Sequence, residues 1–170
     1  METAYIALGS NLPSPVGTPS QTLDAAILRL AELGRVIARS SYYATEPVGY
    51  ADQPMFLNAA VALETTLEPL PLLDRLLAIE QSFGRERGIP NGPRTLDLDL
   101  LLYGELIRST VRYRVPRPDL LRRIYMLQPL AELAPDLIHP ESGLSIAAHC
   151  ARLLRSEPAL IPMTLDLNAA

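Results

Sequence analysis

The sequence has 170 residues, a formal net charge of −4 and a hydrophobic fraction of 48%, which fits one folded domain and excludes wholesale disorder. Its one cysteine excludes an internal disulfide framework, and all fifteen basic residues are arginines, which excludes Schiff-base and lysine phosphate-loop chemistry. The acidic balance, with neither a signal peptide nor a long apolar run, predicts a cytoplasmic protein that binds neither nucleic acid nor membrane.

The first half of the chain predicts three strands and two helices. A buried strand covers 3–9, a helix follows with Ser20 as its N-cap and Gly34 as its C-cap, and further strands cover 35–45 and 56–66. Apolar residues at helical spacing then predict a helix over 70–83, with these residues facing the core: Leu72, Leu73, Leu76, Leu77 and Ile79.

The second half predicts a long mobile loop over 84–93, rich in glycine and proline, and a fourth strand over 95–103. An irregular segment around Pro116 and Pro118 precedes helices over 125–133, despite Pro129, and 144–154. The order β-α-β-β-α-β predicts an α+β fold with a ferredoxin-like core, in which two helices pack on one face of a four-stranded antiparallel sheet. The extra C-terminal helices would pack at the end of the sheet or on its open face. Since this fold hosts many functions, the site must identify the function.

Asp97 and Asp99 are two residues apart in the predicted fourth strand, so they share one face while Leu96, Leu98 and Leu100 enter the core on the other. Two carboxylates about 7 Å apart repel each other but can bracket Mg²⁺, which commonly uses one or two carboxylates plus substrate phosphates. Two metals held in this way clamp the attacking and leaving oxygens of a phosphoryl transfer. The alternative is that this strand lies at a solvent-facing edge, where the two aspartates keep the sheet soluble.

The positive charge of the chain gathers around this strand. Nine arginines and five acidic residues lie between positions 85 and 123, whereas the rest of the chain is acidic. Such a local positive stretch favours a small polyanion over a polymer as the ligand. Arg85, Arg87 and Arg94 flank the 84–93 loop and are placed to close over a triphosphate; the alternative for each is a surface salt bridge.

A second group of residues lies in the predicted third strand. Phe56 and Asn58 point to the same side of it, and an amide that both donates and accepts suits a planar heterocycle. Phe56 either stacks on such a ring or fills the core. Asn58 either contacts the ring or forms a hydrogen bond at the end of the strand. His139 and His149 lack metal-ligand spacing and are interpreted as structural or surface residues, and Cys150 as a small buried hydrophobe.

Six blocks of sequence then carry a family resemblance: 4–11, 45–58, 84–85, 92–99, 115–118 and 125–135. In this order and spacing they resemble 6-hydroxymethyl-7,8-dihydropterin pyrophosphokinase, over roughly residues 3–154, and the specific block is Gly-Pro-Arg-Thr-Leu-Asp-Leu-Asp at 92–99. The resemblance implies transfer of an intact diphosphoryl group from ATP to the hydroxymethyl group of the reduced pterin, leaving AMP, as a step of folate biosynthesis. It further implies two Mg²⁺ ions, one domain over 1–158 and a tail over 159–170; we expect a monomer.

The resemblance also implies roles for individual residues. Asp97 and Asp99 would hold the metal ions, and Arg85 and Arg94 would stabilise charge during transfer. The pterin site would consist of Thr45, Val48, Phe56, Asn58 and Tyr125, with Tyr125 stacking on the opposite face of the ring. The nucleotide would be surrounded by Glu80, Arg87, Arg94, Leu100, Arg112, Arg117 and Arg123.

The chain departs from the family pattern at a few positions. Arg117 stands where the common Val-Pro-His pattern has histidine, so a neutral donor near the phosphates becomes a permanent cation. Arg114 stands where a small hydroxyl residue can occur, Tyr125 replaces the usual phenylalanine, and the loop between Arg87 and Arg94 has no tryptophan.

Two other functions compete with the pyrophosphokinase. One is a second kind of metal-dependent transferase on the same fold, such as a nucleotidyltransferase that uses the same aspartates. The other is a non-catalytic ligand-binding module. If the chain is the kinase, we expect the 84–93 loop to close over ATP as a lid.

Overall fold

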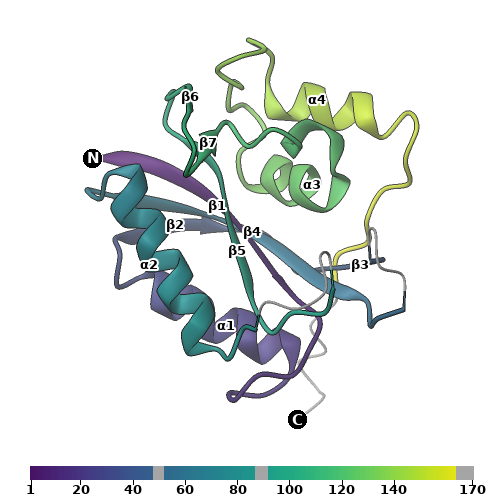
Figure 1. Cartoon of the computed structure of the whole chain (residues 1–170). Coiled ribbons are helices and arrows are strands. Elements are labelled where there is room, and N and C mark those ends of the chain that lie inside the picture. Colours follow the sequence, from purple (N-terminus) through teal and green to yellow (C-terminus); the bar gives the residue numbers. More distant parts are fainter. Residues whose placement is uncertain (48–51, 87–91, 164–170) are drawn as a thin grey trace.

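The computed structural model describes residues 1–47, 52–86 and 92–163, and these form a mixed α and β fold (Figure 1). The elements are β1 (Glu2–Ser10), α1 (Pro19–Leu30), β2 (Arg35–Arg39), β3 (Tyr43–Thr45), β4 (Phe56–Thr65), α2 (Pro69–Ser82), β5 (Asp97–Tyr103), β6 (Arg108–Ser109), β7 (Arg114–Val115), η1 (Leu120–Arg122), α3 (Ile124–Leu133) and α4 (Ile146–Leu153). No helix among the described residues is long and apolar enough to cross a lipid bilayer.

The main sheet is antiparallel and has the strand order β2-β4-β1-β5, with β3 also paired to β4. The predicted ferredoxin-like order is therefore confirmed, but the strand expected over 35–45 is two strands. The break lies at Ser40, where the hydroxyl accepts the Ala60 N–H and so replaces a backbone carbonyl in the ladder. Both pieces remain on β4, which places β3 beside the start of that strand.

The sheet separates two apolar cores, because successive residues of a strand point to opposite faces. Ile6 and Leu8 of β1 pack in the core with α1 and α2, whereas Ala7 lies in the core with α3 and α4. Figure 1 shows α1 and α2 on one side of the sheet and α3 and α4 on the other, so the C-terminal helices take the open face. Leu101 and Leu102 of β5 belong to this second core.

Several predicted details of the first helix are wrong. The N-cap is Thr18, not Ser20, because Thr18 and Gln21 form a reciprocal capping box and Pro19 takes the first helical position. The helix ends at Leu30, and Gly34 is not its C-cap. Gly34 is instead required by a close backbone approach, since a Cβ there would lie 2.1 Å from the Glu64 carbonyl oxygen.

The second helix buries a narrower face than its five apolar residues predict. Leu72, Leu76 and Ile79 are buried, Leu73 packs at the margin of the core, and Leu77 is 39% exposed. Leu77 therefore belongs to the outer surface of α2. The helix thus presents part of its apolar surface to a cavity rather than to the core.

The C-terminal half contains two features that were not predicted. β6 and β7 form a short hairpin whose two-residue strands carry no periodic pattern. In addition, the segment after α4 runs back to the sheet, where the Met163 N–H donates to the Tyr42 carbonyl (2.7 Å). Gln128 of α3 holds the same segment by exchanging two hydrogen bonds with the Leu160 backbone (2.9 and 2.7 Å).

Candidate active site

Asp97 and Asp99 lie side by side on one face of β5, as the period of a strand requires. Their backbone partners in β1 are Gly9 and Ala7, and Leu98 between them is buried on the opposite face. The two aspartates share their face of the sheet with α3 and α4, but they line cavities instead of packing in the core. Their side chains are 19% and 25% exposed, so both remain accessible to a ligand.

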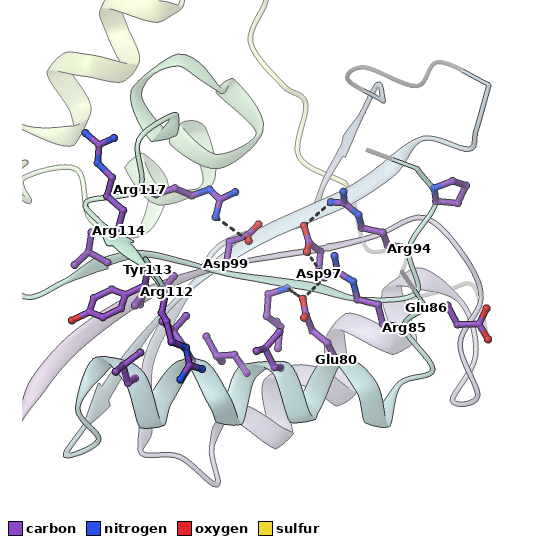
Figure 2. A pocket seen from close by; sticks show the side chains of 18 residues that line it. Glu80, Arg85, Glu86, Arg94, Asp97, Asp99, Arg112, Tyr113, Arg114 and Arg117 are labelled. Atoms are coloured by element: carbon purple, nitrogen blue, oxygen red, sulfur yellow. Dashed lines mark hydrogen bonds and ion pairs between the residues drawn. The ribbon is translucent and has the colours of Figure 1, made fainter. Parts of the chain in front are cut away.

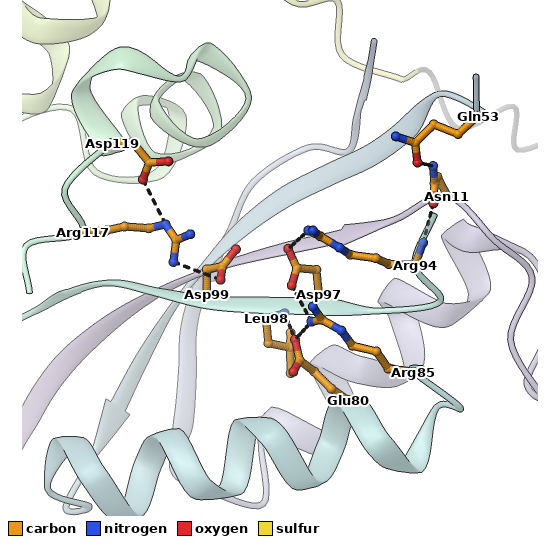
Figure 3. Close-up of polar contacts among 10 residues, drawn as sticks. All are labelled: Asn11, Gln53, Glu80, Arg85, Arg94, Asp97, Leu98, Asp99, Arg117 and Asp119. Atoms are coloured by element: carbon orange, nitrogen blue, oxygen red, sulfur yellow. Dashed lines mark hydrogen bonds and ion pairs between the residues drawn. The ribbon is translucent and has the colours of Figure 1, made fainter. Parts of the chain in front are cut away.

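Asp97 is held by two arginines from either end of the 84–93 loop (Figure 3). Arg85 contacts one carboxylate oxygen at 2.6 Å and Arg94 contacts the other at 3.0 Å. Burial raises the pKa of Asp97, but the positive charges of Arg94 and Arg85 outweigh burial and bring the pKa below its ordinary value. Asp97 is therefore an ionised carboxylate.

Asp99 has a different environment. Arg117 donates to it at 3.0 Å and also contacts Asp119 at 3.2 Å. Burial, followed by repulsion from Asp97, raises the pKa of Asp99 to about 7 in spite of Arg117. A further cation between Asp97 and Asp99 would relieve the repulsion between their carboxylates. The two carboxylates therefore suit a divalent ion.

Glu80 of α2 contacts the site from the face of β5 that packs against α2. Its carboxylate is buried, accepts the Leu98 N–H at 2.8 Å and forms an ion pair with Arg85. Burial raises its pKa to about 7. Since Arg85 bridges Glu80 and Asp97, the helix fixes the direction of the guanidinium that reaches the site.

Arg94 is positioned by Asn11, which lies just after β1. The Asn11 side-chain oxygen accepts the Arg94 N–H at 2.8 Å, and the Asn11 N–H donates to the Arg94 carbonyl at 3.0 Å. Asn11 also donates to Gln53 at 2.9 Å (Figure 3). Asn11 lies in the first block of the family resemblance, but its tie to Arg94 was not predicted, because the two residues are 83 positions apart.

A first cavity of about 510 Å³ lies between α2, β5 and β7 (Figure 2). One wall is apolar and consists of Leu70, Leu73, Leu76 and Leu77 from α2. The rest is highly charged and contains five arginines: Arg85, Arg94, Arg112, Arg114 and Arg117. Glu80 and Leu100, which were predicted beside the nucleotide, also line this cavity.

A second cavity of about 390 Å³ lies on the other side of the aspartates. Thr45, Phe56, Asn58 and Tyr125 line it, so the structure brings together the predicted pterin residues that it describes. The Asn58 amide nitrogen donates to the Thr45 hydroxyl at 2.6 Å, which fixes the orientation of the amide. Gly9 keeps the space open, since a Cβ there would lie 2.8 Å from the Asn58 side-chain oxygen.

The two cavities meet at a common wall. Five residues line both of them: Arg85, Arg94, Asp97, Asp99 and Arg117. A ligand in either cavity would therefore approach the same two carboxylates. This shared set contains all four residues predicted to be catalytic, together with Arg117.

Other predicted residues lie apart from this wall. Arg112 lines the first cavity but is exposed and forms an ion pair with Asp74 at 2.9 Å. Arg123, predicted at the nucleotide, lines the second cavity. Val48 and Arg87 fall outside the described residues, as does much of the predicted 84–93 lid.

The remaining sequence predictions concern residues away from the cavities. His139 is buried and contacts His149 edge to face, with ring centroids 5.8 Å apart, and Cys150 is buried in the second core. In the part of the chain that the structure describes, no group of three or more histidine, cysteine or acidic residues is arranged to hold a metal ion. Asp97 and Asp99 are two hard oxygen ligands, and Mg²⁺ in proteins is commonly held by one or two carboxylates plus substrate phosphates.

Comparisons with known proteins give the family that the chain resembles. Residues 5–135 match the sequence model of the family described as 7,8-dihydro-6-hydroxymethylpterin-pyrophosphokinase (HPPK). A 2-amino-4-hydroxy-6-hydroxymethyldihydropteridine pyrophosphokinase of Pseudomonas aeruginosa is 48% identical over 141 residues, which cover 83% of this chain and 86% of the relative. The Haemophilus influenzae protein of the same name is 45% identical over 146 residues, covering 85% and 89%.

A solved structure supports the fold separately. The chain is similar to the crystal structure of wild-type Plasmodium falciparum HPPK-DHPS, with a TM-score of 0.70 and 14% sequence identity. The similarity covers 91% of this chain but 45% of that longer chain. At this level of identity, the comparison shows that the backbone arrangement is shared.

Proposed function

Because the chain belongs to the 7,8-dihydro-6-hydroxymethylpterin-pyrophosphokinase family, we propose that it transfers the diphosphoryl group of ATP to 6-hydroxymethyl-7,8-dihydropterin. The products are the pterin diphosphate and AMP, and the reaction belongs to folate biosynthesis. The observation that carries this proposal is the common wall of the two cavities, because a transfer between two substrates requires both to reach one set of charged groups.

The first cavity binds ATP in this proposal. The leucine wall of α2 offers an apolar surface to the base, and the arginines offer bidentate hydrogen bonds to the phosphates. Arg112 adds to nucleotide affinity rather than to chemistry, since it is exposed and in Figure 2 its side chain points toward α2 and not toward Asp97 and Asp99. Arg87, which the structure does not describe, stays a predicted nucleotide contact.

The second cavity binds the pterin. Phe56 and Tyr125 supply the aromatic surfaces between which a flat ring stacks. Asn58 supplies a directed amide for the polar edge of that ring, because Thr45 already fixes the amide nitrogen. The hydroxymethyl group then points to the common wall.

The transfer itself depends on position and charge. The hydroxymethyl oxygen attacks the β-phosphorus and loses its proton to water, the bond from this phosphorus to the oxygen shared with the α-phosphate breaks, and AMP leaves with that oxygen. Arg85 and Arg94, oriented by Glu80 and Asn11, stabilise the negative charge that spreads over the phosphoryl oxygens. Little else is required of the protein, since phosphoryl transfer is catalysed mainly by alignment and electrostatics.

Asp97 and Asp99 hold two Mg²⁺ ions in this proposal. The donor set fits, because these are hard oxygen ligands that the protein leaves incomplete and because a cation would relieve the repulsion that raises the pKa of Asp99. When bound, Mg²⁺ would join the carboxylates to the ATP phosphates and neutralise their charge. A monomeric state and a cytoplasmic location stay predictions from the sequence.

A product assay tests the function. The protein is incubated with ATP, Mg²⁺ and the reduced pterin alcohol, and the nucleotide products are separated by chromatography. AMP in equal amount to the pterin diphosphate supports the proposal. Free pyrophosphate with an adenylylated pterin would instead assign a nucleotidyltransferase, and binding without turnover would assign a non-catalytic module.

A further inference from the structure

Arg117 occupies the site in a way that the other arginines do not. Its backbone N–H donates to the Leu101 carbonyl of β5 at 2.9 Å, so its main chain is fixed to the strand that carries Asp99. Its guanidinium then forks, with Nη1 on Asp99 at 3.0 Å and Nε on Asp119 at 3.2 Å. The side chain remains 34% exposed and lines both cavities.

The two aspartates differ in how they are neutralised. Asp97 contacts two arginines, whereas Asp99, among the residues that the structure describes, forms its ion pair with Arg117 alone. A divalent ion that binds between the aspartates needs an oxygen of Asp99. Arg117 already contacts one of these oxygens, so it competes with the ion for the same carboxylate.

Arg117 has a second anchor that does not depend on Asp99. Asp119 contacts its Nε at 3.2 Å, so a rotation of the side chain that takes Nη1 away from Asp99 leaves an acidic partner beside the guanidinium. Since Arg117 lines the arginine-rich cavity, its free end then faces the proposed phosphates of ATP. An anionic phosphate would replace Asp99 as the partner of the fork.

We propose that Arg117 is a displaceable counter-ion, which keeps Asp99 paired in the absence of nucleotide and moves to the phosphates when ATP delivers the metal. This inference rests on the proposed function of the aspartates. It assigns Arg117 a positioning role, because the residue controls when the metal site becomes available. The consequence is an order of binding: the metal enters together with the nucleotide and binds poorly before it.

The test measures Mn²⁺ binding to the full chain without nucleotide, by the loss of the free-ion EPR signal. Arg117→Gln removes the competing charge, so we expect Mn²⁺ to bind about tenfold more tightly than to the unaltered protein. Arg108→Gln removes the same charge from an exposed position in β6 and should leave the affinity unchanged. Arg117→Met, which retains the packing of the apolar stem, should reproduce the gain and guards against a folding defect in the Gln variant.

Two further measurements distinguish a failure of the counter-ion role of Arg117 from a failure of the proposed function. Adding Asp99→Asn to Arg117→Gln should cancel the gain, and a gain that persists would overturn the competition at Asp99. The measurement is then repeated with α,β-methylene-ATP, after subtracting the loss of signal that the nucleotide causes without protein, and the unaltered protein should bind Mn²⁺ at least as tightly as Arg117→Gln does without nucleotide. Equal affinities of both proteins without nucleotide, with normal binding in its presence, overturn the counter-ion role but leave the proposed function intact. No Mn²⁺ binding to either protein under any condition overturns both.

Discussion

The two cavities that meet at Asp97 and Asp99 recognise ligands by different physical means. The first presents five arginines beside an apolar wall, which suits a polyanion, and three of these arginines also line the second. The second adds two aromatic rings, a hydroxyl and an oriented amide, which suit a flat polar ring. In the proposed function, specificity is therefore built away from the reaction point, while the residues shared by the two cavities supply the chemistry for both ligands.

The fold produces this division. The first cavity takes its walls from α2, β5 and β7, and the second takes them from β3, β4 and the start of α3. Among the residues that the structure describes, the start of β5 and the segments beside it contribute to both. Substitutions should therefore fall into three groups: those that impair both substrates together, those that impair the nucleotide and those that impair the pterin.

The largest effect should follow from the shared aspartates. Asp97→Asn or Asp99→Asn removes one of two metal-ligating charges, so we expect turnover to fall by at least about 10³-fold. Steady-state rates with both substrates at saturation measure the loss, and circular dichroism establishes that the fold persists. A fully active Asp99→Asn variant would show that the Asp99 carboxylate is not required for the transfer.

A somewhat smaller effect should follow from Arg94→Gln. If Arg94 stabilises charge that develops during transfer, as we propose, kcat should fall by about 10²- to 10³-fold while KM for ATP changes much less. Arg75→Gln, an exposed position on α2, is the matched control and should have little effect. A change confined to KM would show that Arg94 binds ATP without stabilising the transition state.

The pterin cavity should respond separately. Asn58→Ala removes the directed amide and exposes the Thr45 hydroxyl, so the pterin Kd should rise by about tenfold or more. When the Asn58→Ala variant is titrated calorimetrically with ATP alone, its Kd for ATP should equal that of the unaltered protein. Equal losses for both ligands would mean that the cavities are not independent.

The smallest effect should come from the outer edge of the nucleotide cavity. Arg112→Ala removes an exposed charge whose ion pair with Asp74 contributes only about 0–1 kcal/mol, so ATP affinity should fall a few-fold and pterin affinity should not change. The loss should shrink as salt is raised, because exposed charges are screened. A titration of ATP at low and high ionic strength measures both points, and a salt-independent loss would contradict this interpretation.

Sequence periodicity predicted the part of the site that depends on strand geometry. Asp97 and Asp99 on one face and Phe56 and Asn58 on another strand follow from the two-residue repeat. The partners of these residues could not be predicted in the same way. Arg117 reaches Asp99 and Asn11 reaches Arg94 only because loops distant in sequence converge on β5.

The errors in the predicted fold have a similar origin. Gly34 follows a helix, as a C-cap glycine does, but a glycine is required there because the backbone of β4 lies too close for a side chain. The strand over 35–45 has the composition of one strand, and it is divided by a single hydroxyl that bonds to Ala60. Both features depend on a neighbouring strand that the local sequence does not contain.

The most direct test is a crystal structure of the protein with α,β-methylene-ATP, Mg²⁺ and the pterin alcohol bound together. We expect the triphosphate among the arginines, the pterin ring between Phe56 and Tyr125, and metal ions at Asp97 and Asp99. The hydroxymethyl oxygen should face the β-phosphorus across these ions, with Arg117 moved from Asp99 to a phosphate. A triphosphate bound away from the aspartates, or an α- or γ-phosphorus facing the hydroxymethyl oxygen, would contradict the proposed diphosphoryl transfer.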